Sequence, residues 1–423
     1  MFGLTGAIGT LVVYLVVFHL IPPLLAQWDR GPWPKHGGGF RWTKKIAYTL
    51  ASFAMRRAGA TLAIAAVGVV AVIPLLMKVQ VESDLLKFFP EKHRLTQSTQ
   101  FVESQFSGVI NLEIVMDGTG RDSLKDINRL LAIKDFQRWA ETQPHIDRTV
   151  SMMDVIEEMN WAFHGEDAQY RSLPDNNKLL SQLLLVYDGK DLHELVNREY
   201  QRTRILLNVN VHGANAISEV IGKIKGRLES HPIPGVKWDI AGYGRLFSDQ
   251  EDLLVIGQVK SFLGAFGQIF VLLVILWRSF IAAGICLIPN LAPLYFVFAV
   301  MGATGISLDM ATCLIAGVVL GITVDDTIHL YHSYLHRLRQ GASPVFALAR
   351  SFEASGRAVI AVSIILVAQF TLLTASQFQP TAHFGLLAAI GLLAGQLFEL
   401  LLLPALIVIW NRYAPPKPIT ARS

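Results

Sequence analysis

Seven apolar runs along the chain are each long enough to cross a lipid bilayer as a helix. One crossing takes about 20 consecutive apolar residues. The runs of this length lie at 2–27, 58–77, 257–277, 280–303, 308–331, 356–376 and 382–410. A long polar segment, 79–252, separates the second run from the third. The pattern predicts an α-helical polytopic membrane protein with one large domain outside the bilayer.

Within 79–252 the spacing of apolar residues alternates between the period of a strand and that of a helix. Strands are predicted at 111–117, 146–152, 204–211 and 236–242, and the helices that join them at 122–142 and 214–230. The predicted buried face of the first helix is Leu124, Ile127, Leu131 and Phe136. A mostly helical insertion separates the two strand–helix–strand units. Two such units predict an α+β domain of the split βαβ, ferredoxin-like type.

The first apolar run is repeated near the end of the chain. Residues 2–30 (FGLTGAIGTLVVYLVVFHLIPPLLAQWDR) align without a gap to 384–412 (FGLLAAIGLLAGQLFELLLLPALIVIWNR), with thirteen of the 29 positions identical. Glycines, a proline and a closing Trp-x-Arg at a constant offset indicate a duplicated unit. We therefore expect 1–30 to be the last helix of a first repeat. The chain is then the carboxyl half of a longer protein or a half-length protein that needs a partner.

Basic residues predict the orientation of the helices, because Lys and Arg favour the cytoplasmic side of a bilayer. All basic clusters of the loops fall on one side if 79–252 lies outside. The largest cluster is Arg30, Lys35, Arg41, Lys44, Lys45, Arg56 and Arg57. In the same loop, one face of 41–57 carries Trp42, Ile46, Leu50 and Phe53. This pattern favours an amphipathic helix on the inner membrane surface over a solvated linker.

These assignments give six predicted regions. On the amino-terminal side they are the last transmembrane helix of the first repeat (1–30), a cytoplasmic basic amphipathic linker (31–57) and a transmembrane helix (58–78). An extracytoplasmic α+β domain (79–252), a five-helix transmembrane bundle (253–411) and a cytoplasmic tail (412–423) follow. The protein is expected to be a multi-pass protein of the inner (plasma) membrane.

Composition and motifs argue against several functional classes. With 52% hydrophobic and 17% charged residues, the chain falls among membrane proteins, and its small net charge of +4 indicates little by itself. No nucleic-acid partner is expected. Common nucleotide-binding, metalloprotease, serine-hydrolase and paired-cysteine motifs are absent from the sequence. Cys286 and Cys313 lie in apolar runs and are interpreted as core residues. We expect no enzymatic activity, no metal site and no cofactor.

The strongest candidate for chemistry is a pair of acids inside the fifth apolar run. Asp325 and Asp326 follow fourteen residues without an acidic or basic side chain. The next basic residue, Arg337, lies about 16 Å further along a helix. A charge at the centre of a membrane helix costs about 2.5–3.5 kcal/mol on insertion scales, and such residues usually line a proton or ion path. The alternative is a pair held by neighbouring hydroxyls and amides for packing alone.

Adjacent helical residues point about 100° apart. One acid is therefore expected to face the relay while the other supports it. Asp325 is favoured, since it shares a face with Gly321 and His329. Gly317 and Gly321, spaced GxxxG, are expected to let a partner helix pack closely against the relay. His329 is a weaker candidate for passing protons inward.

Other polar residues lie in the last two apolar runs. Glu399 has no nearby Lys or Arg and is a further relay candidate, expected to matter less than either aspartate. Its equivalent in the first repeat is Val17. Ser363 and Thr371 are candidates for supporting the relay. The alternative is that their hydroxyls bond back to their own helical turn.

Three strings carry a resemblance to a known family. They are GVVLGITVDDTIHLYHSY at 317–334, FEASGRAVIAVSI at 352–364 and FGLLAAIGLLAGQLFELLLLPAL at 384–406. Together with the order of one helix, an outer domain and five helices, they resemble the resistance–nodulation–division superfamily. Within it, the chain is most similar to exporters of the mycobacterial-membrane-protein-large type. In that family an acid in the fourth helix of each repeat carries protons, which the resemblance assigns to Asp325 and Asp326.

The resemblance implies export of a hydrophobic or amphiphilic substrate, with a lipid favoured, driven by the proton-motive force. The implied partners are the substrate, the membrane, and the amino-terminal half of the transporter or a second copy in a homo-oligomer. Sterol-sensing and protein-export relatives leave the substrate open. The alternatives are a non-transporting lipid or sterol sensor, a membrane assembly factor, and an inactive truncated half. A sensor would not need a relay acid.

Overall fold

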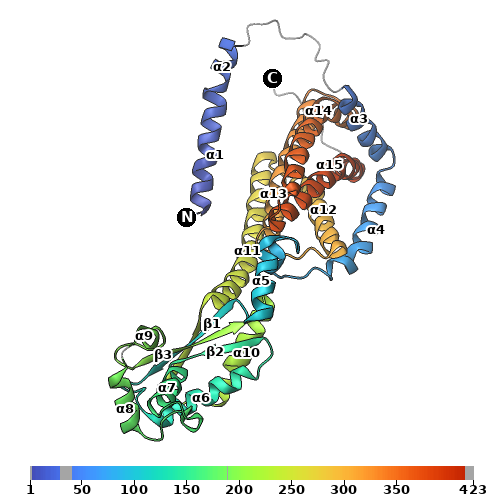
Figure 1. Ribbon diagram of the computed structural model, residues 1–423. Coiled ribbons are helices and arrows are strands. Elements are labelled where there is room, and N and C mark those ends of the chain that lie inside the picture. The colour runs from blue at the N-terminus through green and yellow to red at the C-terminus, as the bar shows by residue number, and fades with distance from the viewer. Residues whose placement is uncertain (1, 29–40, 188, 415–423) are drawn as a thin grey trace.

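The computed structural model of the chain describes residues 2–28, 41–187 and 189–414. Figure 1 shows a helix bundle and an outer α+β domain at opposite ends of one long helix, α11 (Tyr243–Trp277). The basic residues Arg30 and Lys35, and all but the first three residues of the predicted tail at 412–423, lie outside the described residues.

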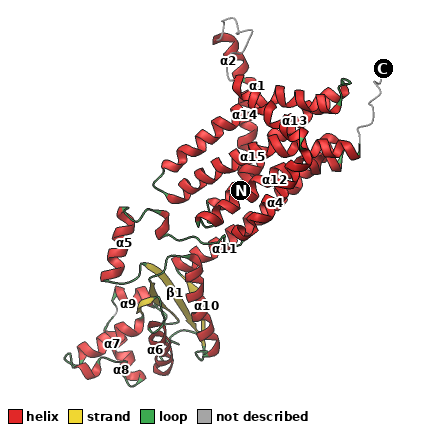
Figure 2. Ribbon diagram, turned by 90° about the vertical axis from the view of Figure 1, so that its right-hand side faces the viewer, coloured by secondary structure: helices red, strands yellow, loops and turns green. Residues whose placement is uncertain are grey.

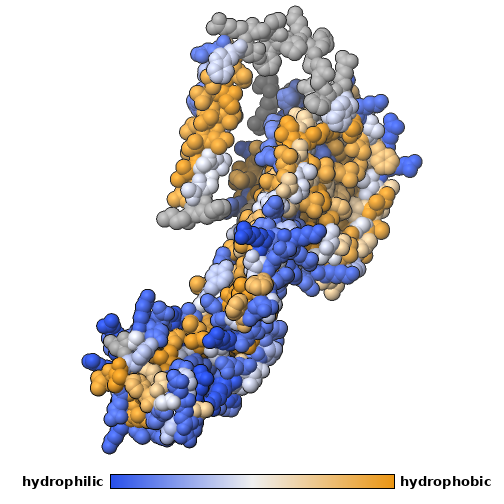
Figure 3. Space-filling model, in the orientation of Figure 1, coloured by the Kyte–Doolittle hydropathy of each residue, from blue (hydrophilic) through white to orange (hydrophobic). Residues whose placement is uncertain are grey.

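Seven helices of the described chain are long and apolar enough to cross a membrane, which confirms the predicted helical polytopic fold. One of the seven spans is Leu4–Trp28. The other six are α11, α4 (Ala58–Leu76), α12 (Phe280–Thr304), α13 (Ile315–Arg339), α14 (Pro344–Leu372) and α15 (Gln379–Tyr413), and they form the bundle together with the shorter helix α3 (Arg41–Arg56). The surface of the bundle in Figure 3 is largely hydrophobic, whereas that of the outer domain is mostly hydrophilic. This contrast is the one expected between a lipid-facing and a water-facing part.

The first helices stand apart from the bundle in Figure 1. They are α1 (Phe2–His19) and α2 (Ile21–Trp28), and none of the span Leu4–Trp28 is buried within the chain. An apolar helix that is exposed on all sides needs lipid or another protein around it. That this helix completes a first repeat remains a prediction.

Helix α3 packs across α14 and α15 at the end of the bundle opposite the outer domain (Figure 1). Its buried side is built from small residues, including Ala47, Ala51 and Ala54. Three bulky residues that the sequence placed on one apolar face are exposed by 41–54%: Trp42, Ile46 and Phe53. The helix therefore has a small-residue face for the bundle and a bulky apolar face left for lipid.

The outer domain is built on a four-stranded sheet, drawn yellow in Figure 2. Its strands are β1 (Ile110–Gly118), β2 (Ile146–Val150), β3 (Arg202–Val209) and β4 (Val236–Ala241). Their order is β2-β3-β1-β4, and each neighbouring pair is antiparallel. Helix α6 (Ile127–Glu141) joins β1 to β2, and α10 (Ala214–Ser230) joins β3 to β4. This order confirms the predicted split βαβ fold.

Further helices cover the outer domain or join it to the bundle. They are α5 (Arg94–Gln105), α7 (Met152–Phe163), α8 (Asn177–Val186) and α9 (Lys190–Leu195). Short 3-10 turns lie at η1 (Leu86–Phe88), η2 (Ala168–Tyr170), η3 (Thr312–Leu314) and η4 (Leu373–Ala375).

The predicted buried face of the first outer-domain helix is partly wrong. Leu131 is 51% exposed, and the buried stripe of α6 runs instead through Leu130, Ile133 and Phe136. Leu124 is buried, but it precedes the helix, which starts at Ile127. A residue outside the helix cannot indicate the helical phase.

Helix α11 crosses the predicted boundary at residue 252 without a break. It starts directly after β4, where Gly242 adopts a φ of 95° and turns the chain from strand to helix. Its 35 residues extend over about 52 Å, well beyond the roughly 30 Å of a hydrocarbon core. Phe247, in its second turn, lies in the core of the outer domain. One continuous helix therefore belongs to both parts of the protein.

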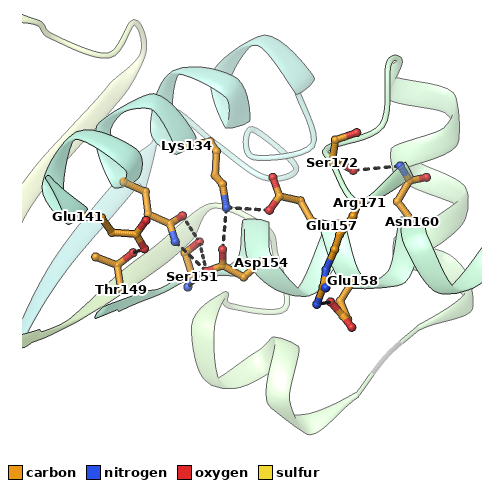
Figure 4. A network of polar contacts seen from close by, with 11 residues as sticks. Lys134, Glu141, Thr149, Ser151, Asp154, Glu157, Glu158, Asn160, Arg171 and Ser172 are labelled. Atoms are coloured by element: carbon orange, nitrogen blue, oxygen red, sulfur yellow. Dashed lines mark hydrogen bonds and ion pairs between the residues drawn. The ribbon is translucent and has the colours of Figure 1, made fainter. Parts of the chain in front are cut away.

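A buried polar network ties α6 to α7 in the outer domain (Figure 4). The Lys134 Nζ lies 2.7 Å from Asp154 Oδ1 and 2.8 Å from Glu157 Oε2. Gln137 and the backbone N–H of Ser151 both donate to Asp154 Oδ2. Burial alone would lower the pKa of Lys134, but its bonds to the two acids outweigh burial and raise the pKa above its usual value. The network therefore holds Lys134 in its charged form.

We expect Lys134→Met to weaken the outer domain by about 2 kcal/mol, since it leaves two acids without their cation. This is less than the about 3–5 kcal/mol of a fully buried pair, because the Asp154 side chain is 36% exposed and partly screened. The opening free energy from hydrogen exchange of segment 127–163 measures the effect. A lysine whose pKa is raised by folding contributes its full stabilisation of the folded state at every pH below its pKa in the unfolded chain, about 10.4. The difference from wild type should therefore be constant from pH 7 to 9.

Lys223→Met is the matched control for this variant. Lys223 forms an exposed ion pair with Glu219 on α10, and such pairs contribute about 0.3–0.5 kcal/mol. Equal losses in the two variants would contradict a stabilising role for the buried network.

Candidate functional site

Helix α13 places the two acids of the predicted relay on different sides. The Asp325 side chain is 72% exposed, whereas Asp326 is half-buried and interacts electrostatically with Glu399 of α15. The turn of about 100° between adjacent helical residues accounts for the difference. Asp326 and Glu399 therefore form the inner part of the site, and Asp325 the outer part.

Four of the predicted site residues lie on one exposed stripe of α13. They follow at intervals of one helical turn: Gly317, Gly321, Asp325 and His329. The His329 Nε2 lies 3.6 Å from Asp325 Oδ1. A Cβ added at Gly317 or Gly321 would have no neighbour within 4 Å in the described structure. The expected small-residue face thus exists, but it contacts no described helix of this chain. We call these four residues the α13 stripe.

Glu399 is buried at the centre of the bundle, where its side chain is 2% exposed. Its Oε2 accepts a hydrogen bond from Thr327 Oγ1 of α13 at 2.9 Å. The Thr327 hydroxyl in turn accepts one from Asn290 Nδ2 of α12 at 2.8 Å. Glu399 Oε1 and Asn290 Oδ1 have no hydrogen-bond partner within the described residues, and no described Lys or Arg pairs with Glu399. The carboxyl group is therefore only half satisfied.

Two glycines of α15 let this helix approach α13 closely enough for the Thr327–Glu399 bond. A Cβ added at Gly391 would lie 2.8 Å from Val319 Cγ2, and one at Gly395 would lie 2.5 Å from Thr323 Cγ2. Gly395 precedes Glu399 by one turn. The GxxxG spacing predicted to matter was that of α13, but Gly391 and Gly395 of α15 carry the same spacing.

Asn290 is a functional candidate that the sequence analysis missed. It is fully buried on α12 between Pro289 and Pro293, and its Nδ2 also donates to the Cys286 carbonyl at 2.8 Å. A single amide in an apolar run between two prolines was the available signal. Its position makes it the third member of a chain Asn290–Thr327–Glu399 that links α12, α13 and α15.

The two predicted supporting hydroxyls behave differently. Ser363 Oγ of α14 donates to Gln396 Oε1 at 2.6 Å, one turn before Glu399 on α15. Thr371 Oγ1 is exposed and donates to the Val367 carbonyl of its own helix at 2.7 Å. The structure brings Ser363 near the acids and leaves Thr371 apart from them.

A solved structure shares this architecture. The hedgehog release protein Disp of the water bear Hypsibius dujardini matches with a TM-score of 0.56 and 15% identity, over 91% of this chain and 52% of its own. The chain thus spans about half the length of Disp. At this identity the likeness shows the fold alone.

Curated sequences give closer matches. A membrane protein of Methanocaldococcus jannaschii is 25% identical over 340 residues, 78% of this chain and 85% of its own length. The protein translocase subunit SecD of Rhodobacter capsulatus is 30% identical over 139 residues, 32% of this chain and 24% of its own. The membrane protein ActII-3 of Streptomyces coelicolor is 29% identical over 157 residues, 35% of this chain and 22% of its own.

The MMPL family model matches residues 87–423, which include most of the outer domain and all of α11–α15. This range contains the α13 stripe and the Asn290–Thr327–Glu399 chain. With this match and the fold of Disp, the chain belongs to the MMPL family of membrane transporters, within the resistance–nodulation–division superfamily.

Proposed function

We propose that the protein couples proton movement through α13 and α15 to the export of a hydrophobic or amphiphilic substrate, with a lipid favoured. The observation that carries this proposal is the buried, half-satisfied carboxyl group of Glu399. No described cation compensates its charge, so gain or loss of a proton changes the local charge by a full unit. The Thr327–Glu399 bond transmits that change from α15 to α13.

The energy of such a step is sufficient to shift a two-state equilibrium. One charge crossing the membrane potential supplies about 2.3 kcal/mol per 100 mV. A few such steps can move a conformational equilibrium from one state to the other. Helix α11 runs from the bundle into the outer domain, so a shift in the bundle would reach the domain that handles the substrate.

A second bundle is expected to cover the α13 stripe. Asp325 is 72% exposed in the middle of a membrane helix, and intramembrane acids usually face protein or a water-filled cavity rather than lipid. The open space at Gly317 and Gly321 would accept a closely packed helix. We propose that the cover is the amino-terminal half of the transporter or a second copy of this chain.

The orientation proposed from the basic loops places the outer domain outside the cytoplasm, and the membrane would be the plasma (inner) membrane. With Cys313 replaced by serine, a cysteine at exposed Gln182 of α8 should react with an impermeant maleimide in intact cells. A cysteine at Ser343, before α14, should react only after permeabilisation. Cys286 is buried and should stay silent. Labelling of Ser343→Cys in intact cells, with Gln182→Cys labelled only after permeabilisation, would contradict the proposed orientation.

Coupling is tested by replacing Asp325 and Asp326 with asparagine in the complete assembly. Asparagine keeps the size and hydrogen bonding of aspartate but has no titrating proton. In proteoliposomes with an imposed pH gradient, dithionite quenching reports the export of a fluorescent NBD-phospholipid. We expect the double variant to lose gradient-driven export at unchanged protein levels. Asp325→Asn should lose more than Asp326→Asn if the acid facing the second bundle titrates.

Three outcomes decide between the proposal and its alternatives. Gradient-driven export by the double variant would contradict the relay. No export by the wild-type assembly, with lipid still bound, would favour a sensor. Export by the isolated monomeric chain would contradict the need for a second bundle.

A further inference from the structure

A cavity of about 490 Å³ opens at the end of the bundle opposite the outer domain. It lies between the end of α3, the start of α14 and the end of α15, segments far apart in the sequence that Figure 1 shows side by side. The cavity is well over one helical turn away from the relay, since Val408 in its wall follows Glu399 by nine residues, about 13 Å of helix. We call it the α3 cavity.

The polar part of the α3 cavity is cationic. Arg56, in the last turn of α3, and Arg412, in the last turn of α15, both line it. No ion pair joins either guanidinium to a described acid, and the described lining contains no Asp or Glu. By contrast, Arg350 of α14, which does not line the cavity, forms an ion pair with Glu353 at 2.6 Å. Two arginines without acids are the usual composition of a phosphate site.

The remaining wall of the cavity is mostly apolar or weakly polar. Met55, Val345 and Val408 supply hydrocarbon surface, and hydroxyls of Ser52 and Ser343 supply donors. A small anion would contact only the arginines and leave the apolar wall exposed to water. A molecule with an anionic head and a hydrocarbon tail would use both parts.

The position of α3 relative to a bilayer fits such a molecule. Its exposed Trp42, Ile46 and Phe53 would enter the acyl region while the basic ends stay among the headgroups. The cavity beside α3 would then lie at headgroup depth in the cytoplasmic leaflet, where anionic lipids attract basic side chains. This step depends on the proposed orientation and not on the proposed export.

We propose that the α3 cavity binds an anionic phospholipid of the cytoplasmic leaflet. Its phosphate would lie between Arg56 and Arg412, with its acyl chains along Met55, Val345 and Val408. The lipid would join the ends of α3, α14 and α15, which stabilises the bundle from a site separate from the relay.

The test uses the purified full chain in detergent at fixed ionic strength. Dioleoylphosphatidylglycerol (DOPG), dioleoylphosphatidylcholine (DOPC) and inorganic phosphate are added separately. The rise in unfolding temperature and the lipid retained in native mass spectra are recorded. Arg56→Gln with Arg412→Gln removes the site charges. The matched control, Arg57→Gln with Arg339→Gln, removes the same net charge from exposed residues that do not line the cavity. Ala349→Leu narrows the cavity and keeps both arginines.

DOPG should stabilise the wild type and the control more than DOPC does, and inorganic phosphate should have no effect. The double site variant should bind DOPG at least about tenfold more weakly, since two charge-assisted contacts are lost. Ala349→Leu should weaken DOPG binding as well. Equal losses in the site variant and the control would show general surface attraction and overturn the proposal. Equal effects of DOPG and DOPC, or stabilisation by phosphate alone, would overturn it too.

Discussion

Glu399→Gln is expected to reduce gradient-driven export to the background level of protein-free liposomes. Glutamine retains the size of the side chain and can still accept the hydrogen bond from Thr327 Oγ1, which spans 2.9 Å in the wild type. It carries no titrating proton at this position, where the wild type has the least exposed of the described acids. The variant therefore separates protonation from packing. The assay is the NBD-phospholipid export measurement with the complete assembly.

The loss of export should not result from misfolding of the variant. Removing a buried acid without a cation partner relieves a desolvation cost, so the unfolding temperature should stay equal or rise. Glu399→Asp keeps a titrating group on a shorter side chain and should retain part of the activity. Thr327→Val keeps the shape of the side chain but removes the hydroxyl between Asn290 and Glu399. This variant should lose gradient-driven export, while the amount of protein in the membrane should change less.

From the sequence, Glu399 was expected to matter less than the aspartates, whereas its burial favours an effect on export at least as large. Export by Glu399→Gln near the wild-type rate would restore the order from the sequence and leave Asp325 and Asp326 as the relay. Loss in all three variants would assign the path to the acids together.

Gly395→Leu is expected to separate α15 from α13, which should abolish export and lower the stability of the bundle. A Cβ at this position would lie 2.5 Å from Thr323 Cγ2 and 3.8 Å from Pro293 Cβ, so a whole leucine side chain cannot fit. Overpacking of a buried site costs about 1–3 kcal/mol, and more where the neighbours are rigid. Glu399 lies one helical turn after Gly395, so separating the two helices would also break the Thr327–Glu399 hydrogen bond. Thermal unfolding in detergent and the export assay measure the two effects.

Gly317→Leu is the matched control, because Gly317 has open space around it in this chain. The stability of the chain alone should be unchanged or slightly higher, since leucine favours helix more than glycine does. Export should nevertheless fall if the α13 stripe packs on a second bundle. A stable and fully active Gly395→Leu variant would contradict the close α13–α15 contact, and a fully active Gly317→Leu variant would contradict a second bundle at the stripe.

The sequence by itself determined the fold class. Spans such as Ala58–Leu76 are set by the length of an apolar run, and the strand alternation of β1 is set by the period of its buried residues, Ile110, Leu112, Ile114 and Met116. Both signals are local, so they need no knowledge of neighbouring elements. The pairing β2-β3-β1-β4 then follows from the order of the two strand–helix–strand units. The motif around Asp325 and Asp326 was sufficient to indicate the family.

Only the tertiary structure decided which side chains meet. Helix α15 is apolar all round, so the sequence could not show that Gly391, Gly395 and Glu399 share the face toward α13. It likewise could not place Asn290 beside Thr327, because they come from different helices. The sequence also could not show that Asp326 faces the bundle and Asp325 faces away from it, because adjacent aspartates on one helix do not indicate where the neighbouring helices lie. The arrangement of the site depends on contacts between helices, and those are set by packing in three dimensions.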